Sequence, residues 1–151
     1  MSVSEAIKKN KSGSRTRARR LAMQAIYQWL MGGLDVNTLE KQFLEDPESQ
    51  HASRDYLSEL IRGVIDNYDN LADALTPHLS RPLKEVDPVE SAVLLIATYE
   101  FRYVLSVPYR AVINEAIELA KIYGAEQGHR FINGVLDKLA NDLRAIERQS
   151  G

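Results

Sequence analysis

Four arginines lie within six consecutive positions near the start of the chain, at Arg15, Arg17, Arg19 and Arg20. A guanidinium group is planar and donates two parallel hydrogen bonds, which matches the geometry of a phosphate group. Residues 1–20 contain seven Lys and Arg and one Glu, a net charge of +6, whereas the whole chain carries −2 and the remainder therefore −8. A basic segment on an acidic body favours a polyanion partner. Because no large apolar residues interrupt the first basic cluster, nucleic acid is favoured over a membrane surface. Two alternatives stay open: the arginines pair with carboxylates of the body, or they form a solvated basic tail.

One amphipathic helix would position these arginines. From Ser14 onward, apolar residues recur at steps of three and four, which is typical of a helix with one buried face. They are Ala18, Leu21, Ala22, Ala25, Ile26, Trp29 and Leu30. Arg15 and Arg19 lie one turn apart. A neighbouring stripe carries Arg17, Arg20, Gln24 and Tyr27. A helix that begins at Ser14 places these cations at its N-terminus, where the helix dipole disfavours them, and we interpret this cost as a sign of function.

A second group of polar residues opens the stretch GAEQGHRFINGVLDKLA, residues 124–140. Here His129, Arg130 and Phe131 lie at the predicted start of the last helix, where backbone N–H groups are available to an anion. Phe131 is either a core residue or a platform on which a base stacks. Gly134 lies inside the same helix at a cost of about 1 kcal/mol relative to Ala, which predicts close helix packing at this position.

The chain as a whole predicts an all-α fold, because no useful stretch alternates at the period of a strand. We expect a compact helical bundle of about seven helices in two three-helix-like subdomains. A disordered basic arm is expected over residues 1–13, a single helical domain over 14–147, and the subdomain boundary near 76–87, in a stretch with prolines at positions 77, 82 and 88. Long helices are expected over residues 56–75 and 127–146. Asp87 and Pro88 predict the start of a helix whose centre, AVLLIA, is apolar all round and should be the buried hub.

The sequence carries no recognisable catalytic or metal-binding pattern. There is no cysteine, and the three histidines, His51, His78 and His129, are scattered. Glu115 and Glu118 lie one turn apart, but an ion pair between Glu118 and Lys121 is far more common than catalysis by two carboxylates. These observations predict a binding protein without cofactor or metal, not an enzyme. No stretch is apolar enough for a membrane span or a secretory signal, so a cytoplasmic protein is expected.

The sequence resembles the NusB family of bacterial transcription antitermination factors. The resemblance runs from Arg15 to about Ala140 and is carried by RTRARRLAMQAIYQW, by DPVESAVLLIATYEF and above all by VPYRAVINEAIELAKIYGAEQGHRFINGVLDKLA. It implies an all-helical protein without enzymatic activity. It also implies binding to the boxA element of rRNA leader transcripts as a heterodimer with ribosomal protein NusE. In that family the complex acts beside RNA polymerase and promotes processive transcription of rRNA operons.

The resemblance also assigns roles to individual residues. The arginine-rich RNA-binding motif falls on Arg15, Arg17, Arg19 and Arg20. Thr16 stands where the motif often has another arginine. The second RNA-contacting region falls on Gln127, Gly128, His129, Arg130 and Phe131. Tyr27 and Glu90 match positions that face the ribosomal protein, and an acidic body suits a basic partner.

Two alternative functions remain. NusB-like domains also occur as RNA-binding modules of rRNA cytosine methyltransferases, and this chain contains no cofactor-binding domain, so it would be a fragment or a descendant of such an enzyme. The other alternative is an interaction module whose basic arm docks on acidic partners. Some family members form homodimers that bury the RNA face, and the sequence leaves the oligomeric state of the free protein open.

Overall fold

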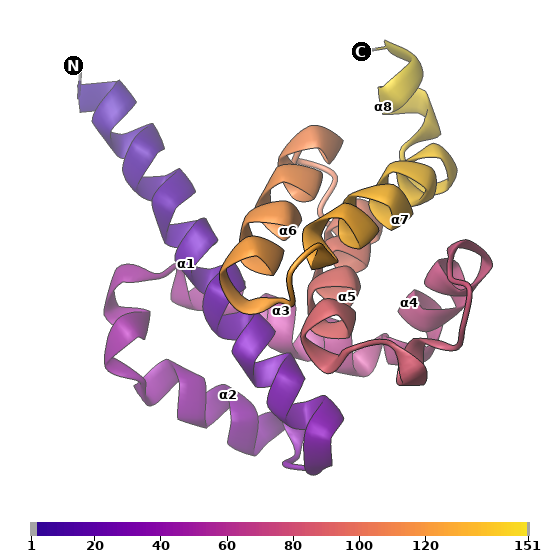
Figure 1. Ribbon diagram of the computed structural model, residues 1–151. Coiled ribbons are helices and arrows are strands. Elements are labelled where there is room, and N and C mark those ends of the chain that lie inside the picture. Colours follow the sequence, from indigo (N-terminus) through magenta and orange to yellow (C-terminus); the bar gives the residue numbers. More distant parts are fainter. Residues whose placement is uncertain (1–2, 151) are drawn as a thin grey trace. The chain divides into compact units, whose positions relative to one another are not determined.

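The structure is a computed structural model that describes the backbone of residues 3–150 and the side chains of residues 13–150 (Figure 1). The described residues form eight α-helices and three short 3₁₀ helices, with no strand among them. The all-α prediction is therefore confirmed. The chain divides into two compact units, Met1–Ile65 and Asp66–Gly151.

The first unit is built on the long helix α1, Val3–Gly32, which packs against α2, Val36–Glu45, and against the 3₁₀ helix η1, Pro47–His51. The third helix, α3, spans Arg54–Asp66. Helix α1 ends at Gly32, and Gly33 follows it with a φ of 92°, a left-handed conformation that favours glycine. Asp35 caps α2 by accepting a hydrogen bond from the Thr38 N–H at 2.8 Å.

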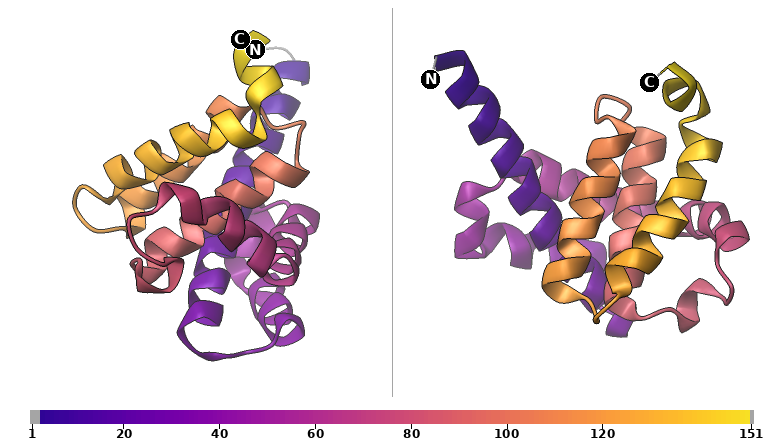
Figure 2. Two further views of the ribbon diagram at one scale, coloured as in Figure 1. Left: turned by 90° about the vertical axis from the view of Figure 1, so that its right-hand side faces the viewer. Right: turned by 45° about the horizontal axis from the view of Figure 1, so that its top comes forward.

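The second unit surrounds helix α5, Pro88–Tyr103. Every residue from Glu90 to Phe101 is buried, which confirms the predicted hub. The helices α6, Tyr109–Tyr123, and α7, Gly128–Leu143, pack against α5 and against each other, and two views show them side by side (Figure 2). The unit also contains α4, Tyr68–Leu75, the 3₁₀ helices η2, Thr76–His78, and η3, Leu83–Glu85, and the terminal helix α8, Ala145–Ser150. Asp87 accepts hydrogen bonds from the N–H groups of Val89 and Glu90, as its sequence context predicts.

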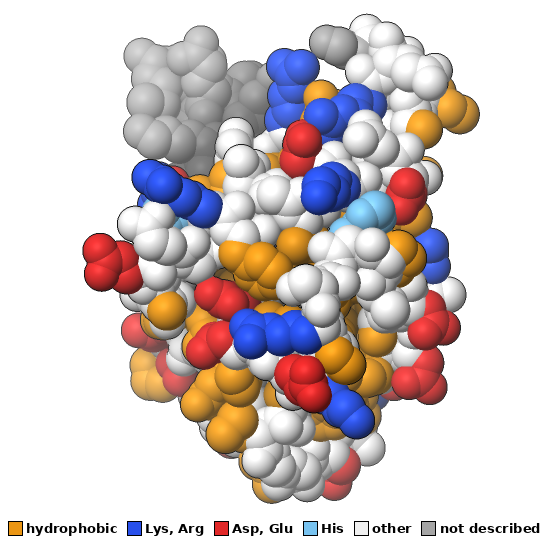
Figure 3. Space-filling model, turned by 45° about the vertical axis from the view of Figure 1, so that its right-hand side comes forward, with side chains coloured by type: hydrophobic (Ala, Val, Ile, Leu, Met, Phe, Trp, Pro, Cys, Tyr) orange, Lys and Arg blue, Asp and Glu red, His pale blue; other side chains and the backbone are white. Residues whose placement is uncertain are grey.

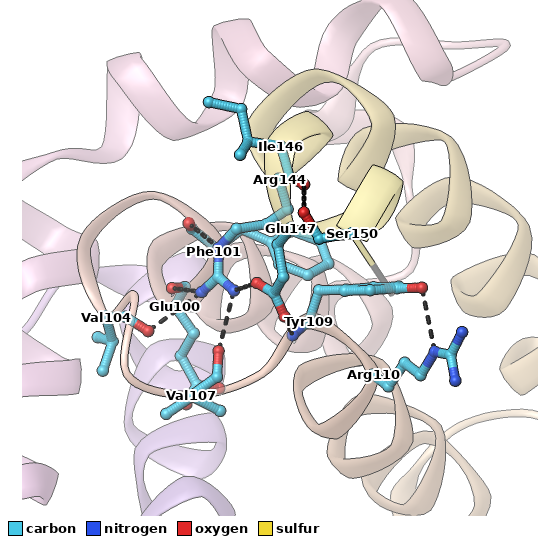
Figure 4. Close-up of polar contacts among 10 residues, drawn as sticks. All are labelled: Glu100, Phe101, Val104, Val107, Tyr109, Arg110, Arg144, Ile146, Glu147 and Ser150. Atoms are coloured by element: carbon cyan, nitrogen blue, oxygen red, sulfur yellow. Dashed lines mark hydrogen bonds and ion pairs between the residues drawn. The ribbon is translucent and has the colours of Figure 1, made fainter.

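A buried arginine, Arg144, links the end of α5 to α8 through hydrogen bonds and an ion pair (Figure 4). The guanidinium group of Arg144, 4% exposed, donates to four backbone carbonyls within 3.1 Å, those of Glu100, Phe101, Val104 and Val107. It also pairs with Glu147 at 2.5 Å. The other carboxylate oxygen of Glu147 accepts the Tyr109 N–H at 2.9 Å, at the start of α6. One side-chain pair thereby satisfies backbone groups at the end of α5, in the following loop and at the start of α6.

The boundaries of several elements differ from the predictions. The expected helix over 56–75 is divided into α3 and α4 around Asn67, and the expected helix over 127–146 ends at Leu143 before α8 begins. Along the chain, the boundary between the two units falls between Ile65 and Asp66, ahead of the expected boundary at 76–87. The physical reason is that the proline-containing stretch 76–87 is held within the second unit by buried Leu83 and Val86.

The start of α1 also differs from the prediction. The helix begins at Val3, not at Ser14. The expected arm, residues 1–13, falls almost wholly on residues whose side chains lie outside the described part of the chain.

Candidate nucleic-acid interface

Two of the arginines line one pocket in the first unit. Arg17 is exposed and Arg20 is partly buried, and both border a pocket with Leu21 of α1 and with Glu48 and His51 of η1. The Nη1 of Arg17 donates to the His51 carbonyl at 3.4 Å, which ties α1 to η1. The Nε of Arg20 is buried and has no hydrogen-bond partner among the described residues. The pocket is therefore lined by two guanidinium groups, one of which has a buried N–H without an acceptor.

The other two arginines share an aromatic neighbour. The guanidinium carbon of Arg15 lies 4.4 Å from the ring centroid of Tyr56, and that of Arg19 lies 5.5 Å from the same centroid. Both distances fall within the range of a cation–π contact. Arg15 remains partly exposed, but Arg19 is only 5% exposed. The sequence groups Arg19 with the other three arginines as an RNA contact. Its side chain differs from theirs because it is buried inside the unit, beside Tyr56.

The pairing of these arginines follows the helical spacing predicted from the sequence. Arg15 and Arg19 meet at Tyr56, and Arg17 and Arg20 meet at the pocket. The expectation that they occupy a helix N-terminus is wrong, because α1 begins at Val3 and the arginines lie in its interior. The helix dipole therefore costs little at these positions.

The second predicted RNA-contacting region lies at the start of α7. Gln127 precedes the helix with a φ of 71°, a left-handed conformation that is uncommon outside glycine. Gln127 and Arg130 are exposed, and His129 and Phe131 are partly buried. Phe131 therefore has an accessible part, as stacking requires, and a part that packs in the unit.

Glu90 lies against the same helix start. A Cβ built on Gly128 would clash with Oε1 of Glu90, so only glycine allows the carboxyl group to approach this closely. Burial raises the pKa of Glu90, the nearby charge of Asp87 raises it further, and Arg81 partly offsets both effects. The carboxyl group of Glu90 therefore lies beside the start of α7, where the sequence predicts N–H groups available to an external anion. Glu90 itself is 8% exposed, so it presents little surface to a partner.

Apolar side chains reach the surface in both units. Tyr27 is 37% exposed and shares a face of α1 with Met31, 58% exposed, one turn further on. In the second unit Ile122 and Tyr123 are exposed at the end of α6. Figure 3 shows one face of the protein, where hydrophobic side chains lie between acidic and basic ones. Exposed apolar groups of this kind are available to a protein partner.

Sequence reasoning missed three residues that lie beside the arginines of α1. Tyr56 appears in the sequence as one more apolar position of a helix, and Glu48 and His51 belong to no recognisable site pattern. Their approach to α1 depends on tertiary packing, since η1 is separated from Arg17 by about thirty residues.

The expectations about catalysis and metals can be compared with the same structure. The predicted ion pair between Lys121 and Glu118 is confirmed, with Nζ and Oε1 3.8 Å apart. In the described part of the chain, no three side chains of His, Cys, Asp or Glu gather into a group that could hold a metal ion. None of its helices has the length and apolar character needed to cross a membrane.

Comparison with known proteins places these features in a family. The sequence profile of the NusB family matches residues 16–141. The transcription antitermination protein NusB of Idiomarina loihiensis is 49% identical over 134 residues, which cover 89% of this chain and 96% of that protein. The protein of the same name from Pseudomonas savastanoi pv. phaseolicola is 49% identical over 139 residues, 92% of this chain and 84% of that protein.

Solved structures agree with this assignment. T. maritima NusB superimposes with a TM-score of 0.79 at 27% identity and covers 89% of this chain and 96% of its own. A crystal structure of the antitermination factors NusB and NusE in complex with dsRNA has the same fold, with a TM-score of 0.73 at 22% identity over 84% of this chain and 96% of that one. The family profile spans Arg17, Arg19 and Arg20 of the first candidate RNA-contacting region, all of the second region and most of the chain, and the chain belongs to the NusB family.

Proposed function

We propose that this protein is a transcription antitermination factor. In this proposal it binds the boxA element of rRNA leader transcripts as a heterodimer with ribosomal protein NusE and promotes processive transcription of rRNA operons. Its relatives are named as transcription antitermination proteins, and the NusB of one similar structure is in complex with NusE and dsRNA. The structural observation that carries the proposal is a pocket lined by exposed Arg17 and partly buried Arg20.

RNA binding is assigned first to α1. Arg15, Arg17 and Arg20 keep accessible guanidinium groups and contact phosphates or bases, whereas buried Arg19 supports Tyr56 and holds the surface in place. In the second unit Gln127, His129, Arg130 and Phe131 extend the contact, with Phe131 stacking on an unpaired base.

Partner binding is assigned to a different surface. Tyr27 is exposed and supplies an apolar contact with a polar tip, a combination that is favoured at protein interfaces. Glu90 is proposed to contribute less directly, through the position of the α7 start that it packs against. The acidic body as a whole attracts a basic ribosomal protein and speeds its association.

The remaining parts of the proposal concern the cellular setting. We place the heterodimer beside RNA polymerase in the cytoplasm, with no enzymatic activity and no cofactor, and the free protein as a possible homodimer. The related proteins favour this function over that of a methyltransferase RNA-binding module, because this chain spans 96% and 84% of the length of two relatives named as antitermination proteins.

The test compares two variants with the unchanged protein in RNA titrations. Arg17→Ala with Arg20→Ala should weaken binding to boxA RNA at least tenfold, because two charge-assisted contacts are lost. Lys41→Ala, an exposed cation of α2, is the control for a change in net charge and should leave affinity nearly unchanged. If three arginines neutralise about three phosphates, the slope of log affinity against log salt should be near −2 for the unchanged protein. A flat salt dependence, or equal losses in both variants, would contradict the assignment.

A further inference from the structure

The pocket between α1 and η1 contains a mixture of charges that an RNA backbone alone does not explain. Arg17 and Arg20 line it from α1, and Glu48 lines it from η1. The negative charge of Glu48, which is exposed, disfavours a phosphate group inside the pocket itself. A suitable ligand must offer acceptors to the arginines and donors to the carboxylate at the same time.

The arginine side of the pocket lacks an acceptor. Buried donors in native proteins are nearly always paired, yet the Nε–H of Arg20 is buried without a partner among the described residues. Arg17 is held beside it through the contact of its Nη1 with the His51 carbonyl. One guanidinium is thus positioned by the protein, and the other carries a buried N–H for which its surroundings supply no acceptor.

We propose that this pocket binds a guanine base of single-stranded RNA, an inference that rests on the RNA-binding function proposed above. Guanine presents O6 and N7 as acceptors, which match an arginine fork, and this is the commonest specific arginine–base contact. Its N1–H and 2-amino groups are two adjacent donors, which a carboxylate accepts together. Uracil places its only donor between two carbonyls that would repel Glu48, and adenine and cytosine offer a single amino group to the carboxylate.

The size and walls of the pocket suit such a base. Its cavity volume of about 190 Å³ is smaller than the roughly 300–1,000 Å³ that is usual for drug-sized ligands, and a single base is smaller than such a ligand. Leu21 and His51 complete the lining, and an imidazole ring is a surface on which a base can stack. The edge that Glu48 reads is paired in a duplex, so the pocket selects an unpaired guanine.

The experiment uses the full-length protein and a short pyrimidine RNA with one guanine placed at each position in turn. At the preferred position, inosine, which lacks the 2-amino group, should weaken binding about fivefold or more, and so should 7-deazaguanine, which lacks N7. Glu48→Ala should remove the difference between guanine and inosine. Arg20→Ala should remove the difference between guanine and 7-deazaguanine.

The control variant is Glu45→Ala, which removes the same charge from an exposed neighbouring position of α2 that does not line the pocket. It should keep both differences. RNA binding without any preference for guanine, or equal tightening of all RNAs by Glu48→Ala, would overturn the guanine site and leave RNA binding intact. If the unchanged protein bound none of these RNAs, the proposed function would be overturned together with the inference.

Discussion

Two glycines of α7 have different surroundings, one at the start of the helix and one in its interior. Gly128 lies against the Glu90 carboxyl group, and any side chain there meets Oε1. Gly134 lies in the same helix but is exposed, and a Cβ would find nothing within 4 Å among the described residues. The prediction of close packing at Gly134 is therefore wrong. The close approach is instead between Gly128 and the carboxyl group of Glu90.

Replacing each glycine by alanine should have opposite effects on stability. Gly134→Ala should raise the free energy of unfolding by about 0.5–1 kcal/mol, because alanine loses less backbone entropy in a helix interior. Gly128→Ala should lower it, because Glu90 must move. Urea unfolding monitored by circular dichroism measures both changes. A destabilising Gly134→Ala would show that this position packs against something that the structure does not place there.

The carboxyl group of Glu90 should make stability depend on pH in an unusual direction. Its pKa is raised in the folded protein, mainly by burial, so its ionised form disfavours folding above that pKa. Glu90→Gln should therefore be more stable than the unchanged protein at about pH 7, and the gap should shrink as the pH falls towards about 4. Unfolding curves at several pH values provide the measurement. A gap that widens as the pH falls would mean that the charged form is stabilised in the folded protein.

At the scale of elements, the junction between α5, α6 and α8 depends on one ion pair. Arg144 satisfies four carbonyls near the end of α5, and its partner Glu147 accepts the first N–H of α6. The pKa of Glu147 is lowered, first by the Tyr109 N–H and then by Arg144. Nothing in the sequence pattern distinguishes Arg144 from the other arginines of the chain, because its role depends on a loop some forty residues earlier.

Removing this arginine should be costly. Arg144→Ala should lower the free energy of unfolding by about 3 kcal/mol or more, because several buried carbonyls lose their donor. Arg144→Lys should recover only part of the loss, because an ammonium group lacks the planar fork. Arg110→Ala, an exposed arginine of α6, serves as the control and should change stability much less. Equal effects of Arg144→Ala and Arg110→Ala would contradict the bridging role of Arg144.

The same elements show what a sequence can and cannot predict. Apolar periodicity and the DPVE cap were sufficient to predict α5 as a buried helix and to place its start. The spacing of the arginines was sufficient to pair Arg15 with Arg19 and Arg17 with Arg20. The accessibility of each pair was not predictable, because it depends on where Tyr56 and η1 pack. The break near Asn67 was missed because the apolar pattern continues through it.

At the scale of the whole molecule, an acidic body carries the basic segment at its N-terminus. This asymmetry separates two kinds of recognition, one for a polyanion and one for a basic protein. The arginine surface belongs to the first unit, and the α7 start, with Glu90 beneath it, belongs to the second. Contacts from both units on one RNA would combine their affinities, and NusE would add contacts of its own.

The most direct test of the central claim is a binding titration with boxA RNA and with a scrambled RNA, with and without NusE, at two salt concentrations. The account predicts preference for boxA RNA, tighter binding with NusE, and weaker binding at higher salt. Tyr27→Ala should lose the gain from NusE and keep the affinity of the free protein for RNA. Equal, weak binding to both RNAs that NusE does not change would contradict the account.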